Sequence, residues 1–378
     1  MKKIFTAFLA IVVICILLAL GDVALNQQKT GGGKQTLTIY NWGDYIDPAL
    51  ITKFEHQTGY HVDYETFDSN ESMLTKIRQG GTNYDVVVPS EYTVQRMKKE
   101  HLIAPLNHRK LPNLKYIDPQ FLNRSFDPDN RYSVPYFWGT LGIIYNDQKV
   151  NGKDVQHWEQ LWNPRLKNNV MLIDSARDVF AVALITQHHS VNTTNYHQLK
   201  LAQAHLKQLT PNVKAIIADE MKMYMEQNEA AVGVTYSGDA REMMNINPHL
   251  HYVVPSEGSN IWFDNMVIPK AARNKKAAYE FINFMLDPQN AAQNAQYVGY
   301  ATPNKAAKKE LPKKITDDKA FYPPETTMKH LQVYRDLPLR VLGEYNDLFL
   351  EFKMFAKCKA NRTSNIKNHV RSPILFLL

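Results

Sequence analysis

The feature that most constrains the fold is a regular alternation of short apolar runs with amphipathic helical patterns in the first part of the chain. The apolar runs predict strands over Leu37–Tyr40, Val62–Phe67 and Tyr84–Val88. Between the first two strands, Asp47 as a cap, Pro48 at the first position and Gly59 at the end mark a helix. Ser69 caps a second helix before the third strand. A βαβαβ unit of this kind requires a parallel sheet and predicts an α/β fold.

A second unit of the same kind follows beyond Gly139. Val170–Ile173 and Ala230–Tyr236 have the composition of strands, and Ala176–Gln187 has an apolar face suited to a helix. The whole chain has 378 residues, which is long for a single core. We therefore expect two α/β domains that face each other across a cleft.

Aromatic and acidic residues follow two strands of the first unit. Trp42, Asp44 and Tyr45 come after the first strand, and Ser90 and Tyr92 come after the third. Open α/β sheets bind ligands beyond the carboxyl ends of their strands. An aromatic ring attracts an ammonium group, and a carboxylate gives it a charge-assisted hydrogen bond. Because two separate strands bring such groups to one edge, we favour an organic polycation site over ordinary surface residues.

The second half of the chain repeats this pattern. The corresponding residues near its strand ends are Asp174, Asp178, Tyr236 and Asp239. A further predicted strand places Trp262 and Asp264 on one face, because they are two residues apart. Tyr300 lies in a later turn. These positions predict that both domains contribute aromatic and acidic groups to one cleft.

The two ends of the chain differ from its body. Lys2 and Lys3 precede a long apolar run, so residues 1–21 predict an export signal that is either cleaved or retained as an anchor. Residues 22–35 include three consecutive glycines and predict a flexible tether. Residues 357–378 contain five basic residues and no acidic one, without helical or strand periodicity. They predict a disordered tail.

Charge and cysteine content narrow the possible functions. The net charge of +7 comes from the two ends, since the leader contributes two positive charges and the tail five. A body without net charge does not repel a small cation, and a nucleic-acid or membrane-surface role depends on the tail alone. The two cysteines, Cys15 and Cys358, lie in the leader and the tail, so core packing must stabilise the body. The mean hydropathy of -0.39 excludes a protein with many membrane spans.

Taken together, these segments resemble the spermidine/putrescine-binding proteins of bacterial polyamine ABC transporters in order and spacing. The resemblance extends from Thr36 to Phe355 and leaves out the leader and the tail. Its most specific motifs are YNWGDYID, FDSNESM, YDVVVPSEY, FDPDNRYSVPYFWG, DSARDVF, NIWFDNMVIP and VGYATPN.

The resemblance implies a two-lobed type II periplasmic-binding-protein fold with a ligand cleft between the lobes. Lobe 1 would comprise residues 36–141 and 264–308, and lobe 2 residues 142–263 and 309–356, with the chain crossing near 141–144, near 262–264 and after 304. The ligand-binding residues implied are Trp42, Asp44, Tyr45, Ser90, Tyr92, Asp178, Tyr236, Trp262, Asp264 and Tyr300.

The implied function is that of the extracellular or periplasmic substrate-binding component of a polyamine importer. It would capture a polyamine by closure of the lobes and deliver it to a membrane permease, acting as a monomer without metal, cofactor or nucleic acid. Ser175, Tyr236 and the pair Tyr334-Arg335 depart from the pattern of the spermidine-binding members. A choice between spermidine and putrescine is therefore left open.

Two alternatives remain at this stage. The sequence contains none of the common nucleophile, zinc, dinucleotide or nucleotide motifs, and its thirteen histidines are scattered, so an enzyme is disfavoured. A solute-binding protein of the same fold could instead bind thiamine, ferric ion or a sugar. Tryptophans have no obvious role around iron, and sugar sites seldom need so many acids, so polyamine is preferred.

Overall fold

The computed structural model describes residues 35–218 and 220–370, with side chains as far as residue 356. The predicted export signal and most of the predicted tether lie within residues 1–34, outside the described residues, as does the end of the tail after residue 370. Within the described part of the chain, no helix is both long enough and apolar enough to cross a membrane.

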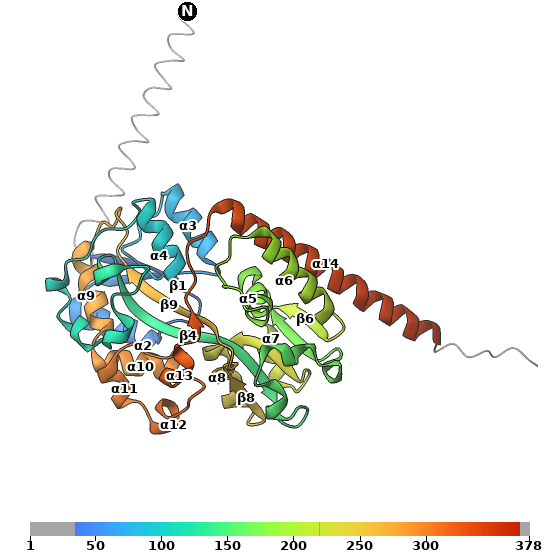
Figure 1. Cartoon of the computed structure of the whole chain (residues 1–378). Helices are drawn as coiled ribbons and strands as arrows, with labels where there is room; N and C mark the ends of the chain where they lie inside the picture. The colour runs from blue at the N-terminus through green and yellow to red at the C-terminus, as the bar shows by residue number, and fades with distance from the viewer. Residues whose placement is uncertain (1–34, 219, 371–378) are drawn as a thin grey trace, which may run out of the picture.

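One mixed sheet runs through the body of the molecule (Figure 1). Its strands are β1 (Thr36–Trp42), β2 (His61–Phe67), β3 (Val86–Val87), β4 (Ser133–Asn146), β5 (Val170–Ile173), β6 (Val213–Ile217), β7 (Val232–Tyr236), β8 (Leu250–Val253), β9 (Ser259–Val267) and β10 (Leu331–Gln332). They follow the order β2-β1-β3-β9-β4-β7-β5-β6, with β10 beside β9 and β8 beside β4. Strand β1 pairs in parallel with β2 and β3, which confirms the predicted βαβαβ unit.

Helices connect these strands. They are α2 (Pro48–Thr58), α3 (Asn70–Gln79), α4 (Glu91–Lys99), α5 (Ala176–Thr186), α6 (Tyr196–Leu209), α7 (Glu220–Glu226), α8 (Ser237–Ile246), α9 (Lys275–Met285), α10 (Pro288–Val298), α11 (Lys305–Glu310), α12 (Lys313–Thr316), α13 (Glu325–Met328) and α14 (Leu339–Val370). Short 3₁₀ helices are η1 (His108–Lys110), η2 (Pro112–Tyr116), η3 (Pro119–Phe121), η4 (Pro128–Asn130), η5 (Gly152–Val155), η6 (Trp158–Trp162) and η7 (Pro164–Leu166).

The predicted ends of α2 are confirmed in detail. The side chain of Asp47 accepts a hydrogen bond from the backbone N–H of Ala49 at 2.9 Å, which satisfies one of the free donors at the helix start. Gly59 ends the helix in the left-handed region with a φ of 77°. Leu50 and Phe54 are fully buried, so one face of this helix packs into the core.

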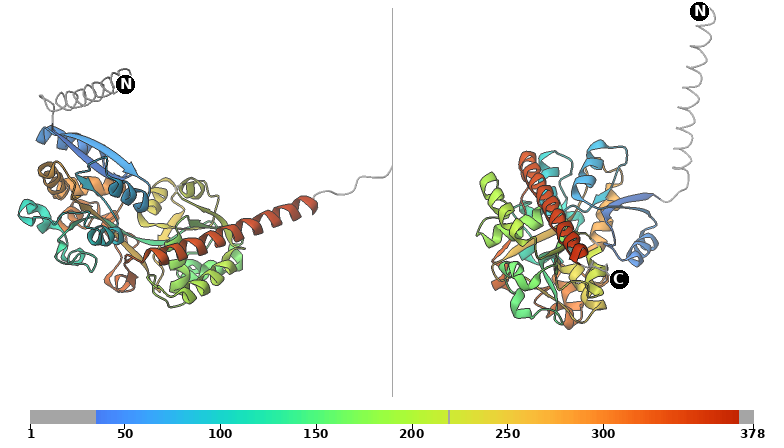
Figure 2. Two further views of the ribbon diagram at one scale, coloured as in Figure 1. Left: turned by 90° about the horizontal axis from the view of Figure 1, so that it is seen from above. Right: turned by 90° about the vertical axis from the view of Figure 1, so that its right-hand side faces the viewer.

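The long strand β4 joins the hydrophobic core of one half of the molecule to two hydrophobic cores in the other half. Strand β4 pairs with β9 as far as Thr140 and with β7 from Leu141 onward. Trp138 belongs to the first core and Leu141 to the second, so β4 passes from one half to the other between these residues. Figures 1 and 2 show β4 and β9 running between the half that contains α2 and α9 and the half that contains α5 and α6. The arrangement is an α/β fold in two parts.

The cores divide the chain at different residues from the predicted lobe boundaries. Ile261 and Phe263 on β9 pack in the first core, although the sequence assigned residues up to 263 to the second lobe. Leu311 also packs in the first core, because α11 lies against α10. After residue 308, Ala320 packs against the third core, in the second half, and Phe321 stacks on Tyr252 of β8. Val333 packs against the first core and Tyr334 in the second. Movement of the two parts as separate lobes stays a prediction.

The C-terminal segment differs from its predicted disorder. Helix α14 continues as helical backbone through residues 357–370. The sequence offers a physical reason, since it has no glycine or proline between Gly343 and Pro373 to end the helix. Figure 2 shows this helix extending past the body of the molecule.

Candidate ligand-binding site

Parallel strands bring the starts of helices α3 and α4 together. Asn70 begins α3 just after β2, and Ser90 caps α4 just after β3. The amide of Asn70 donates to Ser90 Oγ at 3.1 Å and to Tyr92 Oη at 2.9 Å, and its oxygen accepts from the backbone N–H of Ser90 at 3.1 Å. The expected meeting of strand ends at one edge is therefore confirmed for these residues.

The first buried carboxylate lies at this edge. Asp264 on β9 is 6% exposed and accepts hydrogen bonds from Tyr45 Oη and Ser90 Oγ, both at 2.7 Å. Burial raises the pKa of Asp264 from 3.8 to about 6, and the two hydroxyl donors oppose this effect. Asp264 is therefore ionised at neutral pH, at the centre of a small polar cluster.

A second buried carboxylate lies in the other half. Asp178, in the first turn of α5, is 4% exposed. It accepts hydrogen bonds from Tyr236 Oη at 2.7 Å, from Tyr334 Oη at 2.8 Å and from Ser175 Oγ. Tyr236 and Tyr334 come from β7 and from the segment before α14, so three distant parts of the sequence meet at this carboxylate.

The hydroxyl partners of both carboxylates carry no charge. Burial, together with the nearby carboxylate, raises the pKa of Tyr45, Tyr236 and Tyr334 well above the usual value for tyrosine. Each phenol therefore stays protonated and donates to its carboxylate. These hydrogen bonds hold Asp178 and Asp264 in place without cancelling negative charge, which leaves both groups able to attract a cation.

Aromatic rings connect the two carboxylate clusters. The ring of Trp262 packs edge to face against the rings of Tyr236 and Tyr300, with centroid distances of 6.2 Å to Tyr236 and 5.1 Å to Tyr300. Tyr45 meets Tyr300 at 5.5 Å, and Tyr92 meets Tyr334 at 6.5 Å. These contacts and the hydrogen bonds above close a circuit, here called the contact ring. Its members are Asp264, Ser90, Asn70, Tyr92, Tyr334, Asp178, Tyr236, Trp262, Tyr300 and Tyr45.

Two glycines allow the rings to approach the backbone closely. A Cβ atom at Gly238 would lie 2.0 Å from the ring of Tyr300, and one at Gly139 would lie 2.5 Å from the ring of Trp262. Both contacts are far shorter than atoms can tolerate. Trp262 can therefore occupy its place in the contact ring only with glycine at position 139, and Tyr300 only with glycine at position 238.

Eight of the predicted binding residues belong to the contact ring, and Trp42 and Asp44 do not. Trp42 is half-buried and packs against Phe67 at 4.6 Å, and its indole N–H has no hydrogen-bond partner among the described residues. Asp44 is exposed on the turn after β1, where its φ of 50° is left-handed. A binding role for the predicted residues, including these two, stays a prediction.

Sequence reasoning did not select Asn70 or Tyr334. Asn70 follows β2 as Trp42 follows β1, so the rule about strand ends could have found it, but it was assigned only to a helix start. Tyr334 comes from a segment without a clear pattern, and only its departure from the related sequences drew attention to it. Arg335, which also departs from the related sequences, is exposed, and its backbone N–H donates to Asn192 Oδ1 at 2.7 Å.

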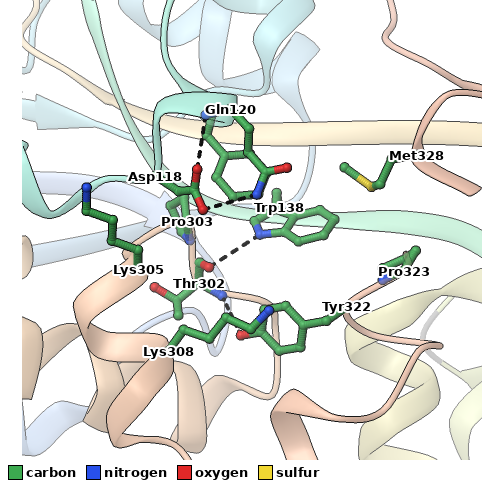
Figure 3. Close-up of a pocket in the computed structure, with 11 residues that line it drawn as sticks. Asp118, Gln120, Trp138, Thr302, Pro303, Lys305, Lys308, Tyr322, Pro323 and Met328 are labelled. Carbon is green, nitrogen blue, oxygen red and sulfur yellow. Dashed lines mark hydrogen bonds between the residues drawn. The ribbon is translucent and has the colours of Figure 1, made fainter. Parts of the chain in front are cut away.

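A separate small pocket is lined by residues outside the contact ring (Figure 3). It has a volume of about 60 Å³, and its lining includes Trp138, Tyr322, Lys305 and Lys308. The ammonium of Lys308 lies 4.0 Å from the centre of the Tyr322 ring. Two lysines make this pocket unsuitable for a cation. Among the side chains that the structure describes, no group of three or more histidine, cysteine or acidic residues is arranged to hold a metal ion.

Comparisons with known proteins identify the family and the fold. A model of the bacterial extracellular solute-binding protein family matches residues 49–323. The spermidine/putrescine-binding periplasmic protein of Salmonella typhimurium is 38% identical over 349 residues, which are 92% of this chain and 98% of that protein.

Two solved structures have a similar fold. The spermidine/putrescine ABC transporter substrate-binding protein PotD of Streptococcus pneumoniae is 55% identical, with a TM-score of 0.79. A Listeria monocytogenes protein, provisionally named a spermidine/putrescine ABC transporter, is 57% identical with a TM-score of 0.81. Each match covers 85% of this chain and 100% of the other. The mixed α/β periplasmic-binding-protein fold that the sequence implied is therefore confirmed.

Proposed function

The chain belongs to the family of bacterial extracellular solute-binding proteins, and we propose that it binds spermidine or putrescine as the substrate-binding component of a polyamine ABC importer. It works in the periplasm or at the cell surface, and it is a transport component, not an enzyme. The observation that carries the proposal is the contact ring, in which Asp178 and Asp264 have uncharged hydroxyl partners and are flanked by aromatic side chains.

The contact ring suits the chemistry of a polyamine. At neutral pH each amine is an ammonium group with three donors, like that of lysine. A carboxylate can accept about four hydrogen bonds, so Asp178 and Asp264 can keep their hydroxyl partners and still bind an ammonium group each. Charge-assisted hydrogen bonds contribute roughly 1.5 to 3 kcal/mol apiece. With ring contacts to the methylene groups, they can supply the roughly 8 kcal/mol that micromolar affinity requires.

Neutral solutes should be rejected by the same groups. A sugar in this site would leave the charges of Asp178 and Asp264 unpaired and shielded from water. An unpaired buried charge costs several kcal/mol, which is enough to exclude a ligand of otherwise suitable shape. The site therefore favours ligands with positive charge at both ends.

Closure of the two parts would follow from the position of the carboxylates. Asp264 is on β9, beside the first core, and Asp178 is on α5, beside the second. A ligand that binds both carboxylates favours the conformation in which the two parts are close. We propose that a membrane permease recognises this closed form, and that the binding protein acts as a monomer.

Calorimetry of residues 36–356 with putrescine, spermidine, spermine, thiamine and glucose tests the function. We expect micromolar binding of putrescine or spermidine and no detectable heat with glucose. Small-angle scattering of the same samples should show a smaller radius of gyration with saturating polyamine. Tighter binding of thiamine than of every polyamine would refute the proposed ligand, and an unchanged radius would refute closure.

Asp264 should make binding depend on pH. Burial raises its pKa to about 6, whereas the ligand's ammonium groups stay protonated up to about pH 10. The ionised carboxylate binds the cation, so below pH 6 the ligand must first displace a proton. We expect the dissociation constant to be nearly constant above about pH 7 and to rise about tenfold per pH unit below about pH 5.5. Titrations over this range would contradict the assignment if affinity stayed flat.

A further inference from the structure

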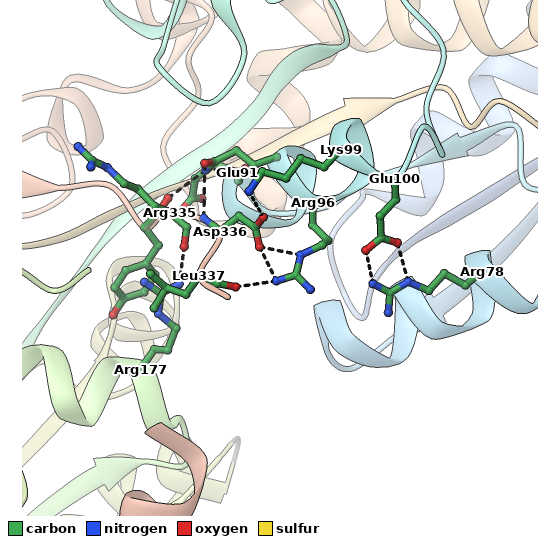
Figure 4. A network of polar contacts seen from close by, with 11 residues as sticks. Arg78, Glu91, Arg96, Lys99, Glu100, Arg177, Arg335, Asp336 and Leu337 are labelled. Carbon is green, nitrogen blue, oxygen red and sulfur yellow. Dashed lines mark hydrogen bonds and ion pairs between the residues drawn. The ribbon is translucent and has the colours of Figure 1, made fainter. Parts of the chain in front are cut away.

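The segment Val333–Leu337 leads from β10 to α14 and is here called the connecting segment. Side chains of helix α4 bind it through hydrogen bonds and ion pairs (Figure 4). Arg96 Nε donates to Asp336 Oδ1 at 2.7 Å. Arg96 Nη2 forms an ion pair with the same oxygen at 2.6 Å and donates to the carbonyl of Leu337 at 2.7 Å. Lys99 donates to the other oxygen of Asp336 at 2.6 Å. Gln95 donates to the carbonyl of Tyr334 at 3.3 Å. Three side chains of one helix thus contact Tyr334, Asp336 and Leu337.

The ion pair between Arg96 and Asp336 is largely shielded from water. Their side chains are 13% and 5% exposed. The planar guanidinium of Arg96 contacts one carboxylate oxygen of Asp336 and the carbonyl of Leu337, and these contacts together fix its distance and its orientation. In Figure 4 the pair lies between α4 and the connecting segment. It is therefore a rigid link rather than a loose surface contact.

The link connects the first and second cores and both site carboxylates. Val94 and Met97 of α4 pack in the first core, whereas Tyr334 and Leu337 pack in the second. At its start, α4 is capped by Ser90, which donates to Asp264 at 2.7 Å.

On the other side of the connecting segment, Tyr334 Oη donates to Asp178 at 2.8 Å. The guanidinium of Arg177 lies 4.0 Å from the centre of the Tyr334 ring and donates to the carbonyl of Arg335 at 3.0 Å. The connecting segment is thus fixed on both sides, by α4 and by α5. A continuous path of bonded groups runs from Asp264 through α4 and Asp336 to Asp178.

On the basis of the proposed polyamine function, we infer that the Arg96–Asp336 pair sets the spacing between the two site carboxylates and so determines which length of polyamine the site accepts. Neither residue belongs to the contact ring. Both act through Ser90 and Tyr334, so they are positioning residues. Loss of the Arg96–Asp336 pair would change the distance between the carboxylates of Asp178 and Asp264. The ammonium groups of a short diamine and of a longer triamine have different separations, so the change would affect the two ligands differently.

The test compares dissociation constants of putrescine, cadaverine and spermidine for the wild-type protein, Arg96→Gln, Arg96→Lys and Asp336→Asn. We expect the ratio of the spermidine and putrescine constants to change by about tenfold in Arg96→Gln and Asp336→Asn, which corresponds to about 1.4 kcal/mol. Arg96→Lys keeps the positive charge but loses the planar group with several donors. The ratio of the spermidine and putrescine constants for this variant should therefore lie between that of Arg96→Gln and that of the wild type.

A control is the ion pair between Arg78 and Glu100, in which two arginine nitrogens donate to the two carboxylate oxygens. This pair joins α3 to the end of α4 within the first half. Glu100→Gln should leave the ratio unchanged. Lys99 is 66% exposed, so Lys99→Gln removes only an outer contact of Asp336. If the Arg96 variants fail to fold, this variant takes their place. It should shift the ratio of the constants in the same direction by a smaller factor.

The outcomes separate this inference from the proposed function. Folded variants that weaken all three amines by one common factor, or by none, would overturn the inference while leaving the function intact. A wild-type protein that binds none of the amines would overturn both.

Discussion

Asp264→Asn is expected to weaken polyamine binding about 100-fold, because it removes the negative charge from one end of the site. Asparagine keeps the shape of the side chain and can still accept from Ser90, but it offers an ammonium group only a neutral oxygen. Loss of charge assistance from one or two hydrogen bonds amounts to about 3 kcal/mol. Calorimetric titration with putrescine and spermidine measures the effect directly.

Stability provides an internal check on this variant. The pKa of Asp264 is raised in the folded protein, so ionising it opposes folding at neutral pH, and this cost disappears as pH falls below its ordinary value. Asp264→Asn carries no charge and should melt at or above the wild-type temperature at pH 7. Weak binding by a well-folded variant would then be a direct effect on the ligand.

Asp174→Asn is the matched control for the loss of charge. Asp174 also follows a strand, but it is exposed and pairs with Lys353 at 2.6 Å. Its replacement should change affinity less than about twofold, as expected for an exposed ion pair. Equal losses in Asp174→Asn and Asp264→Asn would mean that overall charge, rather than the contact ring, attracts the ligand.

Trp262→Ala is expected to weaken binding about 30-fold, the second largest effect. Trp262 lies between Tyr236 and Tyr300 and gives the site its largest aromatic surface. A desolvated ring contact with an ammonium group is worth about 2 kcal/mol, which corresponds to this factor. Trp262 also packs against the first core, so its loss could destabilise the protein. The ligand-free titration baseline and the melting temperature of Trp262→Ala should therefore be recorded together with its affinity.

Two variants separate the binding effect from loss of packing. Trp262→Phe keeps an aromatic face and should cost no more than about fivefold, since cation–ring attraction weakens but persists in phenylalanine. Trp162→Ala removes a half-buried tryptophan that stacks on His205 at 4.2 Å in the second half, away from the contact ring. If Trp162→Ala lowered affinity as much as Trp262→Ala, general destabilisation would explain both results.

Local sequence patterns predicted most of the fold. The caps at Asp47 and Ser69, the glycine that ends α2 and the parallel pairing of β1 with its neighbours all appear as expected. These features depend on contacts between residues close in sequence, where propensity and periodicity act directly. Boundaries were less accurate, since the third predicted strand is shorter in the structure, where it spans only Val86–Val87.

The candidate site was predictable only in part. Alternation along a predicted strand selected Asp264, and the strand-end rule selected Tyr45, Ser90 and Asp178, all of which lie in the contact ring. The strand-end rule selected Asp44 equally, which the structure leaves exposed. A strand end fixes which edge of the sheet a residue occupies, but the turn that follows decides the direction of the side chain.

The sequence by itself determined the α/β class, the edge at which the acidic and aromatic residues gather, and the family resemblance. Only the tertiary structure decided that Tyr334 reaches Asp178, that Arg96 links α4 to the connecting segment, and that both carboxylates have hydroxyl partners. The physical reason is separation along the chain. Tyr45 and Asp264 are 219 residues apart, and Tyr334 and Asp178 are 156 apart. Such pairs depend on how two cores pack, which no local periodicity records.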